Sequence, residues 1–183
     1  MTGVPGRSRL RTVLVVIVCI LALELLGGLS SRVAGPTDLN PWYQALQKPA
    51  LQPPGPVFGL AWAILYGTIA AALGLVLTTR EARGKALAVG LFLLQLAMNL
   101  AWSPLFFQAH RMADAFWLLI GMIVVTVLII WRFATIRRAA ALLMLPYLAW
   151  LGFASYLNWS IVRLNPDGGP AISQGTETAI PPR

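Results

Sequence analysis

The side chains that can do chemistry in this chain are aromatic rings and amides repeated at helical spacing. One segment carries such residues at intervals of three, four, four and three, which places them on a single helical face. They are Tyr147, Trp150, Ala154, Asn158 and Ile161. An amide inside a bilayer is costly unless it faces protein or a cavity, so this face should point inward. Its chemistry is that of a ligand site built from aromatic stacking and amide hydrogen bonds.

Two other segments repeat the pattern, and together the three faces predict an aromatic box edged with amides. The residues are Gln95, Asn99, Trp102 and Phe106 in one segment and Trp62, Tyr66 and Ile69 in the other. A well-packed bundle without a ligand is the alternative, because inward amides also link helices, at about 0.6 kcal/mol each. Tryptophans also form belts at membrane surfaces, which would account for Trp117, Trp131 and Trp159.

The loop before the second of these segments favours the ligand cavity. It runs from Pro41 to Phe58, contains five prolines, and lies between two long apolar stretches. We call it the lid, because a passive linker has no need of its aromatic pair, its lone lysine and its prolines. The lid residues expected at a ligand site are Trp42, Tyr43, Lys48, Pro53 and Pro54.

The elements that must position these residues are membrane-spanning helices. The chain is 58% hydrophobic and only 11% charged, far from the composition of soluble domains. Apolar runs long enough to cross a bilayer cover about residues 13–31, 57–77, 86–107, 115–130 and 139–162. Spans must satisfy their own backbone groups in lipid, so they are helices. The sequence predicts an all-α integral membrane protein, a five-helix bundle in one domain over 1–166, with a flexible polar tail over 167–183.

The basic residues predict the orientation of this bundle. Five spans put nine basic residues on the side of the N-terminus and five on the other side. The positive-inside bias therefore places the N-terminus in the cytoplasm and the lid and C-terminus outside. Basic residues near headgroups also attract anionic lipid, so the net charge of +8 requires no nucleic-acid partner. A cleaved signal peptide is the alternative for the first run, but its apolar core is long and no small-x-small site follows it.

Several classes of chemistry have no residues here to carry them. The single cysteine, Cys19, excludes an internal disulfide and a thiolate metal cluster. No catalytic triad, paired-carboxylate site, phosphate-binding glycine loop or metal-ligand spacing occurs, so hydrolysis and phosphoryl transfer are set aside. The only histidine, His110, is either an axial haem ligand or, more often for a lone loop histidine, a solvated polar residue.

Glu24 and a set of small residues complete the candidates. A carboxyl group deep in the first span is a functional candidate by default, as a proton relay or a partner for an inward donor. The alternative is that the Glu24 carboxyl group is protonated and hydrogen-bonded between helices, or that it lies nearer the membrane interface. In the third span, Gly90, Ala97 and Ala101 have spacing that lets helix backbones approach, which predicts a homodimer interface.

Four runs of the sequence resemble a known family. The runs WYQALQKPALQPPGPVFGLAWAILY, QLAMNLAWSPLFF, RMADA and PYLAWLGFASYLNWSIVRLN resemble, in this order, the TspO/MBR family. These are tryptophan-rich sensory proteins related to the mitochondrial translocator protein. The resemblance covers residues 42–165 and agrees with a five-helix plan. It differs at Ala50 and Leu51, where many members carry a tryptophan.

The resemblance implies a ligand and its site. It implies binding of tetrapyrroles, above all protoporphyrin IX or haem, and of hydrophobic drug-like molecules, with no cofactor required, and homodimers formed through the third span. The pocket residues it implies are Trp42, Tyr43, Trp62, Asn99, Trp102, Tyr147, Trp150, Ala154 and Asn158. Cholesterol is disfavoured, because Trp159 stands where the animal recognition pattern has a tyrosine.

Three classes of function follow, all in a bacterial membrane, with the inner one favoured by helical spans. The first is a receptor or sensor that regulates tetrapyrrole handling or a stress response. The second is an enzyme that degrades porphyrin with light and oxygen, for which the resemblance implies Trp62 and Trp150. The third is a transporter of porphyrins or lipids, although no inverted repeat is evident.

Overall fold

The computed structural model describes residues 5–34, 39–80 and 82–169, and within these ranges every regular element is a helix. The helices are α1 (Pro5–Ala34), α2 (Pro41–Ala45), α3 (Gly55–Thr78), α4 (Lys85–Phe107), α5 (Met112–Ile136), α6 (Arg138–Leu143) and α7 (Leu145–Leu164). In these ranges five stretches are long and apolar enough to cross a membrane, with α6 and α7 together forming the last. The prediction of an all-α membrane bundle of five helices is confirmed. Residues 170–183 of the expected polar tail lie outside the described residues.

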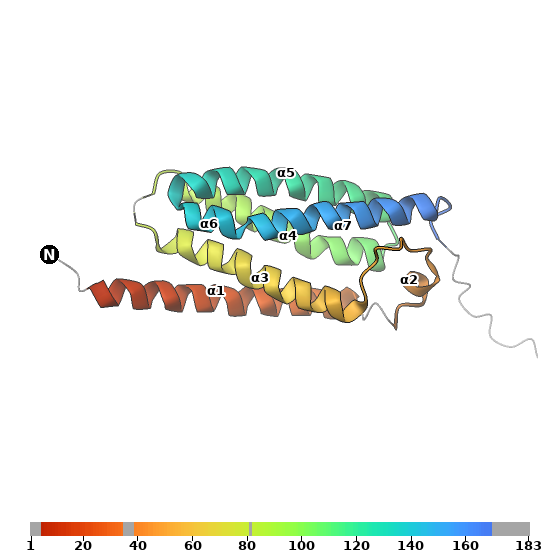
Figure 1. Ribbon diagram of the computed structural model, residues 1–183, viewed down its shortest axis with the longest axis horizontal. Helices are drawn as coiled ribbons and strands as arrows, with labels where there is room; N and C mark the ends of the chain where they lie inside the picture. The colour runs from red at the N-terminus through yellow and green to blue at the C-terminus, as the bar shows by residue number, and fades with distance from the viewer. Residues whose placement is uncertain (1–4, 35–38, 81, 170–183) are drawn as a thin grey trace, which may run out of the picture.

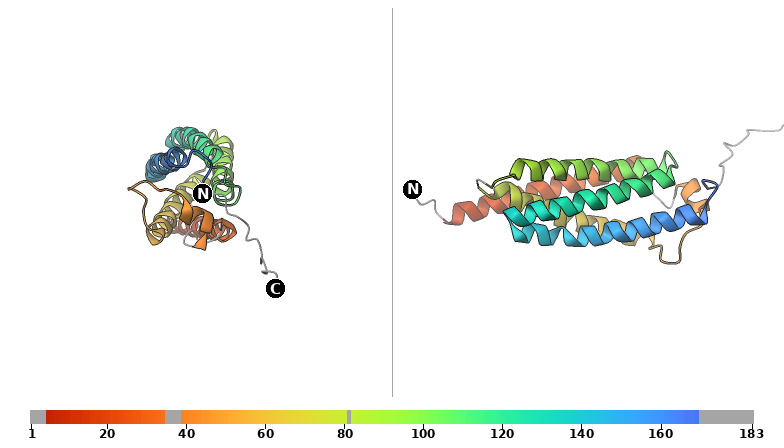
Figure 2. Two further views of the ribbon diagram at one scale, coloured as in Figure 1. Left: turned by 90° about the vertical axis from the view of Figure 1, so that its right-hand side faces the viewer. Right: turned by 90° about the horizontal axis from the view of Figure 1, so that it is seen from above.

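The spans run side by side along the long axis of the molecule and close into a ring (Figure 1). Helix α1 packs on α3, α3 on α6 and α7, α7 on α5, α5 on α4, and α4 back on α1. The views along and across the bundle in Figure 2 show the same arrangement. A ring of five helices leaves an interior to which each span contributes one face.

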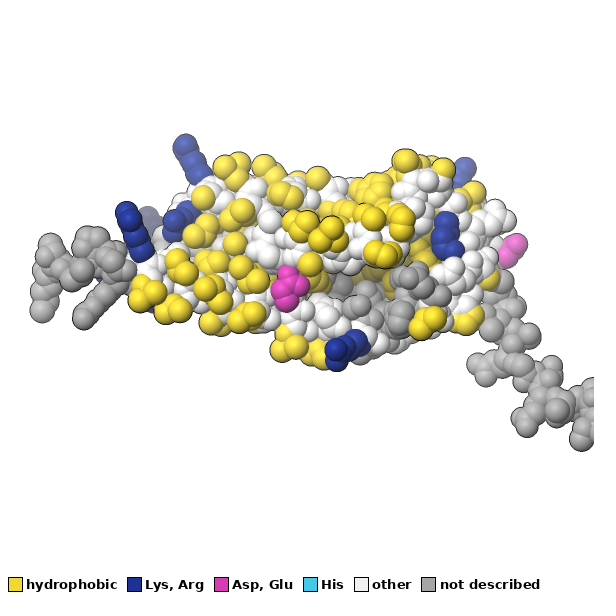
Figure 3. Space-filling view, turned by 60° about the horizontal axis from the view of Figure 1, so that its bottom comes forward, with side chains coloured by type: hydrophobic (Ala, Val, Ile, Leu, Met, Phe, Trp, Pro, Cys, Tyr) yellow, Lys and Arg dark blue, Asp and Glu magenta, His cyan; other side chains and the backbone are white. Residues whose placement is uncertain are grey.

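The outer surface of this ring is apolar, as a bilayer requires. Hydrophobic side chains cover much of the face in Figure 3, and most of its lysine and arginine side chains lie towards the two ends, with one near the middle of the lower edge. Helix α1 is the least enclosed span, with side chains such as Leu14, Leu21 and Leu25 more than half exposed. Apolar residues that face outward along a whole helix are expected where lipid is the solvent.

The two ends of the bundle differ in packing. At the end that holds the short α3–α4 and α5–α6 connections the interior is solid, and Phe92 stacks on Phe133 with ring centroids 6.3 Å apart. Met144 and Ile129 are fully buried beside them. The lid lies at the opposite end, next to the start of α3 and the end of α7 (Figure 1). Internal space is therefore concentrated under the lid.

Two details differ from the sequence expectation. The fourth span continues beyond residue 130 to Ile136, because the helix extends past the hydrocarbon layer until the extended backbone of Arg137 ends it. The fifth span is not one helix, since α6 ends at Leu143 and α7 begins at Leu145. Pro146 explains the break: it has no N–H to bond the carbonyl four residues earlier, and its ring would clash with that carbonyl.

Candidate functional site

The lid is a folded segment that is fixed to the bundle. Its first residues form α2, which is capped by Asn40: the Oδ1 atom accepts a hydrogen bond of 3.0 Å from the backbone N–H of Tyr43. The Nδ2 atom of Asn40 donates to the carbonyl oxygen of Phe107 at the end of α4. The last four residues of the lid form the first turn of α3. The prolines between these points stiffen the chain, so the lid has one defined position over the bundle.

A reciprocal pair of hydrogen bonds fixes the other side of the lid. The backbone N–H of Gln47 donates to Oδ1 of Asn165 (3.0 Å), and Nδ2 of Asn165 donates back to the carbonyl oxygen of Gln47 (2.9 Å). Within the lid, Nε2 of Gln52 donates to the hydroxyl of Tyr43 (2.9 Å). The lid is thereby joined to both α4 and α7, two of the helices that carry the expected binding faces.

A cavity of about 620 Å³ lies beneath the lid. It is lined by the last turns of α1, the first half of α3, the second half of α4, the first half of α5 and most of α7. All expected ligand residues except Trp42 and Tyr147 line it: Tyr43, Lys48, Pro53, Pro54, Trp62, Tyr66, Asn99, Trp102, Phe106, Trp150, Ala154 and Asn158. The lid and the three periodic faces therefore meet around a single space.

Trp42 and Tyr147 lie behind this lining. The indole of Trp42 is 2% exposed, meets Phe106 edge-on and stacks on His110 with ring centroids 4.0 Å apart. His110 is exposed and does not line the cavity, which leaves it outside the site. Tyr147 is completely buried below Trp62, with ring centroids 6.5 Å apart. Both residues support the wall of the cavity instead of facing its space.

The aromatic wall of the cavity is built mainly from indoles. Trp62 meets Trp150 nearly at right angles with ring centroids 6.2 Å apart, and it also lies 5.5 Å from Tyr66. On the opposite helix, Trp102 stacks on Phe106 at 5.1 Å. The Nε1 atoms of Trp102 and Trp150 are buried and have no hydrogen-bond partner in the described part of the chain. The wall therefore presents flat aromatic faces to the cavity, while these two N–H groups are enclosed by the protein.

A network of hydrogen bonds forms the polar floor. The hydroxyl of Tyr66 donates to Oδ1 of Asn99 (2.6 Å), and Nδ2 of Asn99 donates to the hydroxyl oxygen of Tyr147 (3.0 Å). Nε2 of Gln95 donates to the same oxygen at 2.7 Å. The amides expected to point inward do so, and most of their polar atoms serve to join α3, α4 and α7.

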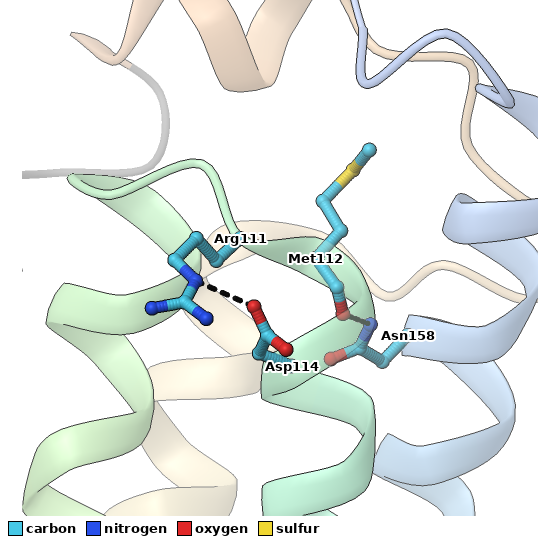
Figure 4. Close-up of polar contacts among 4 residues, drawn as sticks. All are labelled: Arg111, Met112, Asp114 and Asn158. Atoms are coloured by element: carbon cyan, nitrogen blue, oxygen red, sulfur yellow. Dashed lines mark hydrogen bonds and ion pairs between the residues drawn. The ribbon is translucent and has the colours of Figure 1, made fainter.

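Asn158 holds the lid end of α7 against α5. Its Nδ2 atom donates to the carbonyl oxygen of Met112 at 2.9 Å, as Figure 4 shows. The same view shows the ion pair of Arg111 with Asp114, which closes the first turn of α5. The Oδ1 atom of Asn158 is buried without a partner in the described ranges. Asn158, which also lines the cavity, thus joins α7 to α5.

Sequence reasoning missed the contribution of α1 and α5. Glu24, Gly27, Gly28 and Ser30 line the cavity from α1, and Leu119 and Met122 line it from α5. No aromatic periodicity marks either helix, and only the isolated carboxyl of Glu24 gave a signal. No hydrogen bond or ion pair joins Glu24 to another described residue, and its role stays a prediction.

Lys48 is the cation of the cavity. Its Nζ atom donates to the carbonyl oxygens of Gln44 and Leu46 and lies 4.6 Å from the centre of the Tyr43 ring. Desolvation by burial lowers the pKa of Lys48 below the usual lysine value. Three other described cations at this end, Arg32, Arg111 and Arg163, are exposed and do not line the cavity.

Two further sets of residues lie on the outside of the bundle. Gly90, Ala97 and Ala101 are exposed on the outer face of α4, and no atom lies within 4 Å of the place where a Cβ of Gly90 would stand. Trp117, Trp131 and Trp159 are also exposed, as a membrane belt requires. The described residues contain no cluster of three histidine, cysteine or acidic side chains placed to hold a metal.

Comparison with known proteins agrees with this architecture. The model of the TspO/MBR family matches residues 15–164. The tryptophan-rich protein TspO of Chlorobaculum tepidum is 34% identical over 157 residues, which are 85% of this chain and 99% of that protein. The tryptophan-rich sensory protein of Cereibacter sphaeroides is 36% identical over 68% of this chain and 77% of that protein. The human translocator protein is 38% identical over 68% of this chain and 75% of that protein. The chain belongs to the TspO/MBR family of membrane proteins, which are of the sensor and receptor type.

Proposed function

We propose that this protein is a membrane receptor that binds tetrapyrroles, with protoporphyrin IX or haem as the ligand, and accepts other flat hydrophobic molecules in the same cavity. In a cell such a receptor regulates tetrapyrrole handling or a stress response. The observation that carries the proposal is the pair of indoles, Trp62 and Trp150, 6.2 Å apart on the wall of a cavity of about 620 Å³. Ligand sites of about 300–1,000 Å³ are typical for small molecules.

The chemistry of a porphyrin suits the surfaces that line this space. Its macrocycle is flat and apolar, and each stacked or edge-on contact with an indole adds about 0.5–1.5 kcal/mol beyond burial. Its two carboxylates need cations or donors, and Lys48 supplies a cation on the lid side.

The test is a titration of the purified protein with protoporphyrin IX in the dark, followed by quenching of tryptophan fluorescence. We expect saturable binding that weakens at least about tenfold when Trp62 or Trp150 is replaced by alanine, the loss of one or two such contacts together with their buried area. Trp117→Ala and Trp131→Ala are matched controls, because these indoles are 67% and 61% exposed. Equal losses from all four variants, or no saturable binding, would rule out the cavity as the porphyrin site.

A second activity is favoured by the same two indoles. A bound porphyrin is a photosensitiser, and Trp62 and Trp150 would lie next to it, so light and oxygen either degrade the porphyrin catalytically or oxidise the tryptophans. We expect illumination to oxidise Trp62 and Trp150 and bleaching to stop when they are consumed, as in a receptor. Mass spectrometry of the illuminated protein checks this. A defined product that accumulates over many turnovers would instead make the protein an enzyme.

Orientation and assembly complete the proposal. We infer a bacterial inner membrane as the location, with the N-terminus in the cytoplasm and the lid outside, from the excess of basic residues at one end. The exposed small residues Gly90, Ala97 and Ala101 support a homodimer formed through α4.

A further inference from the structure

Glu24 is an acidic residue within a membrane-spanning stretch, and it lines the cavity. In the span Arg9–Ser30 it lies about 22 Å from the first residue and about 9 Å from the last, at a rise of 1.5 Å per residue. Its side chain is half-buried and lines the cavity. Ionisable groups at this depth are costly and are kept where they have a partner or a task.

The face of α1 that carries Glu24 is turned towards Tyr66. Gly27 follows Glu24 by three residues, which puts the two on one side of the helix. The ring of Tyr66 packs on Gly27 so closely that a Cβ atom at that position would collide with it. The carboxyl group therefore stands beside the polar floor of the cavity.

Three of the donors that line the cavity with Glu24 already have acceptors. The Tyr66 hydroxyl donates to Asn99, the Ser30 hydroxyl donates to the carbonyl oxygen of Leu100, and Lys48 donates to two carbonyl oxygens of the lid. Among the residues that line the cavity, Glu24 and Lys48 are the charged ones, and no ion pair joins them in the described part of the chain. The carboxyl group of Glu24 is therefore available to a ligand in the cavity.

We propose that the cavity also binds flat aromatic molecules that carry a protonated amine, and that Glu24 is the acceptor that selects them. The inference deepens the proposed function, because it assumes that this cavity is the ligand site. A hydrophobic amine partitions into the bilayer and reaches the cavity from the α1 side, where its ring stacks on Trp62 and an N–H group of its protonated form donates to the carboxylate. An ion pair in a site with little water is stronger than the same pair in bulk solvent.

The test uses two fluorescent probes of one shape, 9-aminoacridine as the cation and acridine as the neutral ring, at mildly alkaline pH in the same detergent. We expect the protein to bind the cation more tightly, and Glu24→Gln to weaken that binding at least about tenfold, the size of a charge-assisted hydrogen bond. Binding of acridine should change less than about twofold, since stacking does not need the charge. Glu24→Asp should restore part of the preference.

Leu25→Gln is the matched control. It also places an amide at this depth of α1, but on a side chain that is 65% exposed and does not line the cavity. It should leave both affinities unchanged. Equal losses for both probes in Glu24→Gln, or no preference for the cation in the unaltered protein, would overturn the role of Glu24 while the cavity stands. If neither probe binds, the cavity does not take aromatic amines and the inference fails, while the titration with protoporphyrin IX tests the proposed function separately.

Discussion

The hydroxyl of Tyr66 donates a hydrogen bond of 2.6 Å to Oδ1 of Asn99, inside the bundle and next to the cavity. This bond joins α3 to α4 and fixes the orientation of the amide, since Oδ1 must face Tyr66 and Nδ2 must face the oxygen of Tyr147. One phenol thereby determines the polar floor and the direction of the aromatic ring above it.

Tyr66→Phe should lower the free energy of unfolding by about 1–3 kcal/mol, because it leaves the buried Oδ1 of Asn99 without a donor. Denaturant unfolding in a mild detergent measures this loss. Tyr156→Phe is the control, since Tyr156 is 43% exposed, and a change within about 0.5 kcal/mol is expected there. A similar effect of both substitutions would mean that the bond to Asn99 does not contribute to stability.

Two adjacent glycines of α1 should respond in opposite ways. Gly27→Ala places a Cβ against the Tyr66 ring, which must shift into the cavity, so we expect a loss of about 1–3 kcal/mol in stability and weaker binding of protoporphyrin IX. At Gly28 no atom lies within 4 Å of the new Cβ. Gly28→Ala should be neutral or gain up to about 1 kcal/mol, because alanine favours the helix. Thermal unfolding and titration of both variants check the contrast.

Most of the candidate site follows from periodicity along single helices. Asn99 and Trp102 on α4, and Trp150, Ala154 and Asn158 on α7, share faces that a spacing of three and four residues identifies. Periodicity gives the direction of a side chain but not its depth. For this reason it did not separate Tyr147, which lies below the lining, from the residues that face the space.

The contribution of α1 was not predictable in the same way. Apart from Glu24, its cavity residues are two glycines and a serine, which present no ring, and Gly27 permits the close approach of Tyr66. The serine makes a contact that the sequence does not reveal. Pro104 has no N–H to donate to the carbonyl oxygen of Leu100 within α4, and the Ser30 hydroxyl of α1 donates to that oxygen instead, at 3.3 Å. Contacts between distant helices of this kind need the assembled bundle.

The outer face of α4 is the predicted interface of a homodimer. If two copies meet through Gly90, Ala97 and Ala101, Ala97→Phe should hold the backbones apart and shift the protein from dimer to monomer in size-exclusion chromatography with light scattering. Leu128→Phe, on the exposed side of α5, should leave the dimer intact. A protein that stays dimeric in Ala97→Phe uses another surface.

Lys48 gives the site a dependence on pH. Burial lowers its pKa, so the ammonium group loses its proton at a pH below the usual lysine range. The propionates of protoporphyrin IX remain ionised throughout that range. Their attraction to Lys48 is therefore complete below the lowered pKa and is lost as the pH rises through it. We expect the affinity for protoporphyrin IX to fall across this window in titrations at a series of pH values.

Two variants and one ligand separate this effect from a general response to alkali. Lys48→Met should bind protoporphyrin IX weakly at every pH, whereas Lys48→Arg should bind without the alkaline loss, because a guanidinium group stays charged. The dimethyl ester of protoporphyrin IX has no carboxylate to attract, so its affinity should not follow the titration of Lys48. If the ester and the free acid lose affinity together, the change lies in the fold of the lid. A loss confined to the free acid and abolished in Lys48→Arg would identify Lys48 as the group that receives the carboxylate.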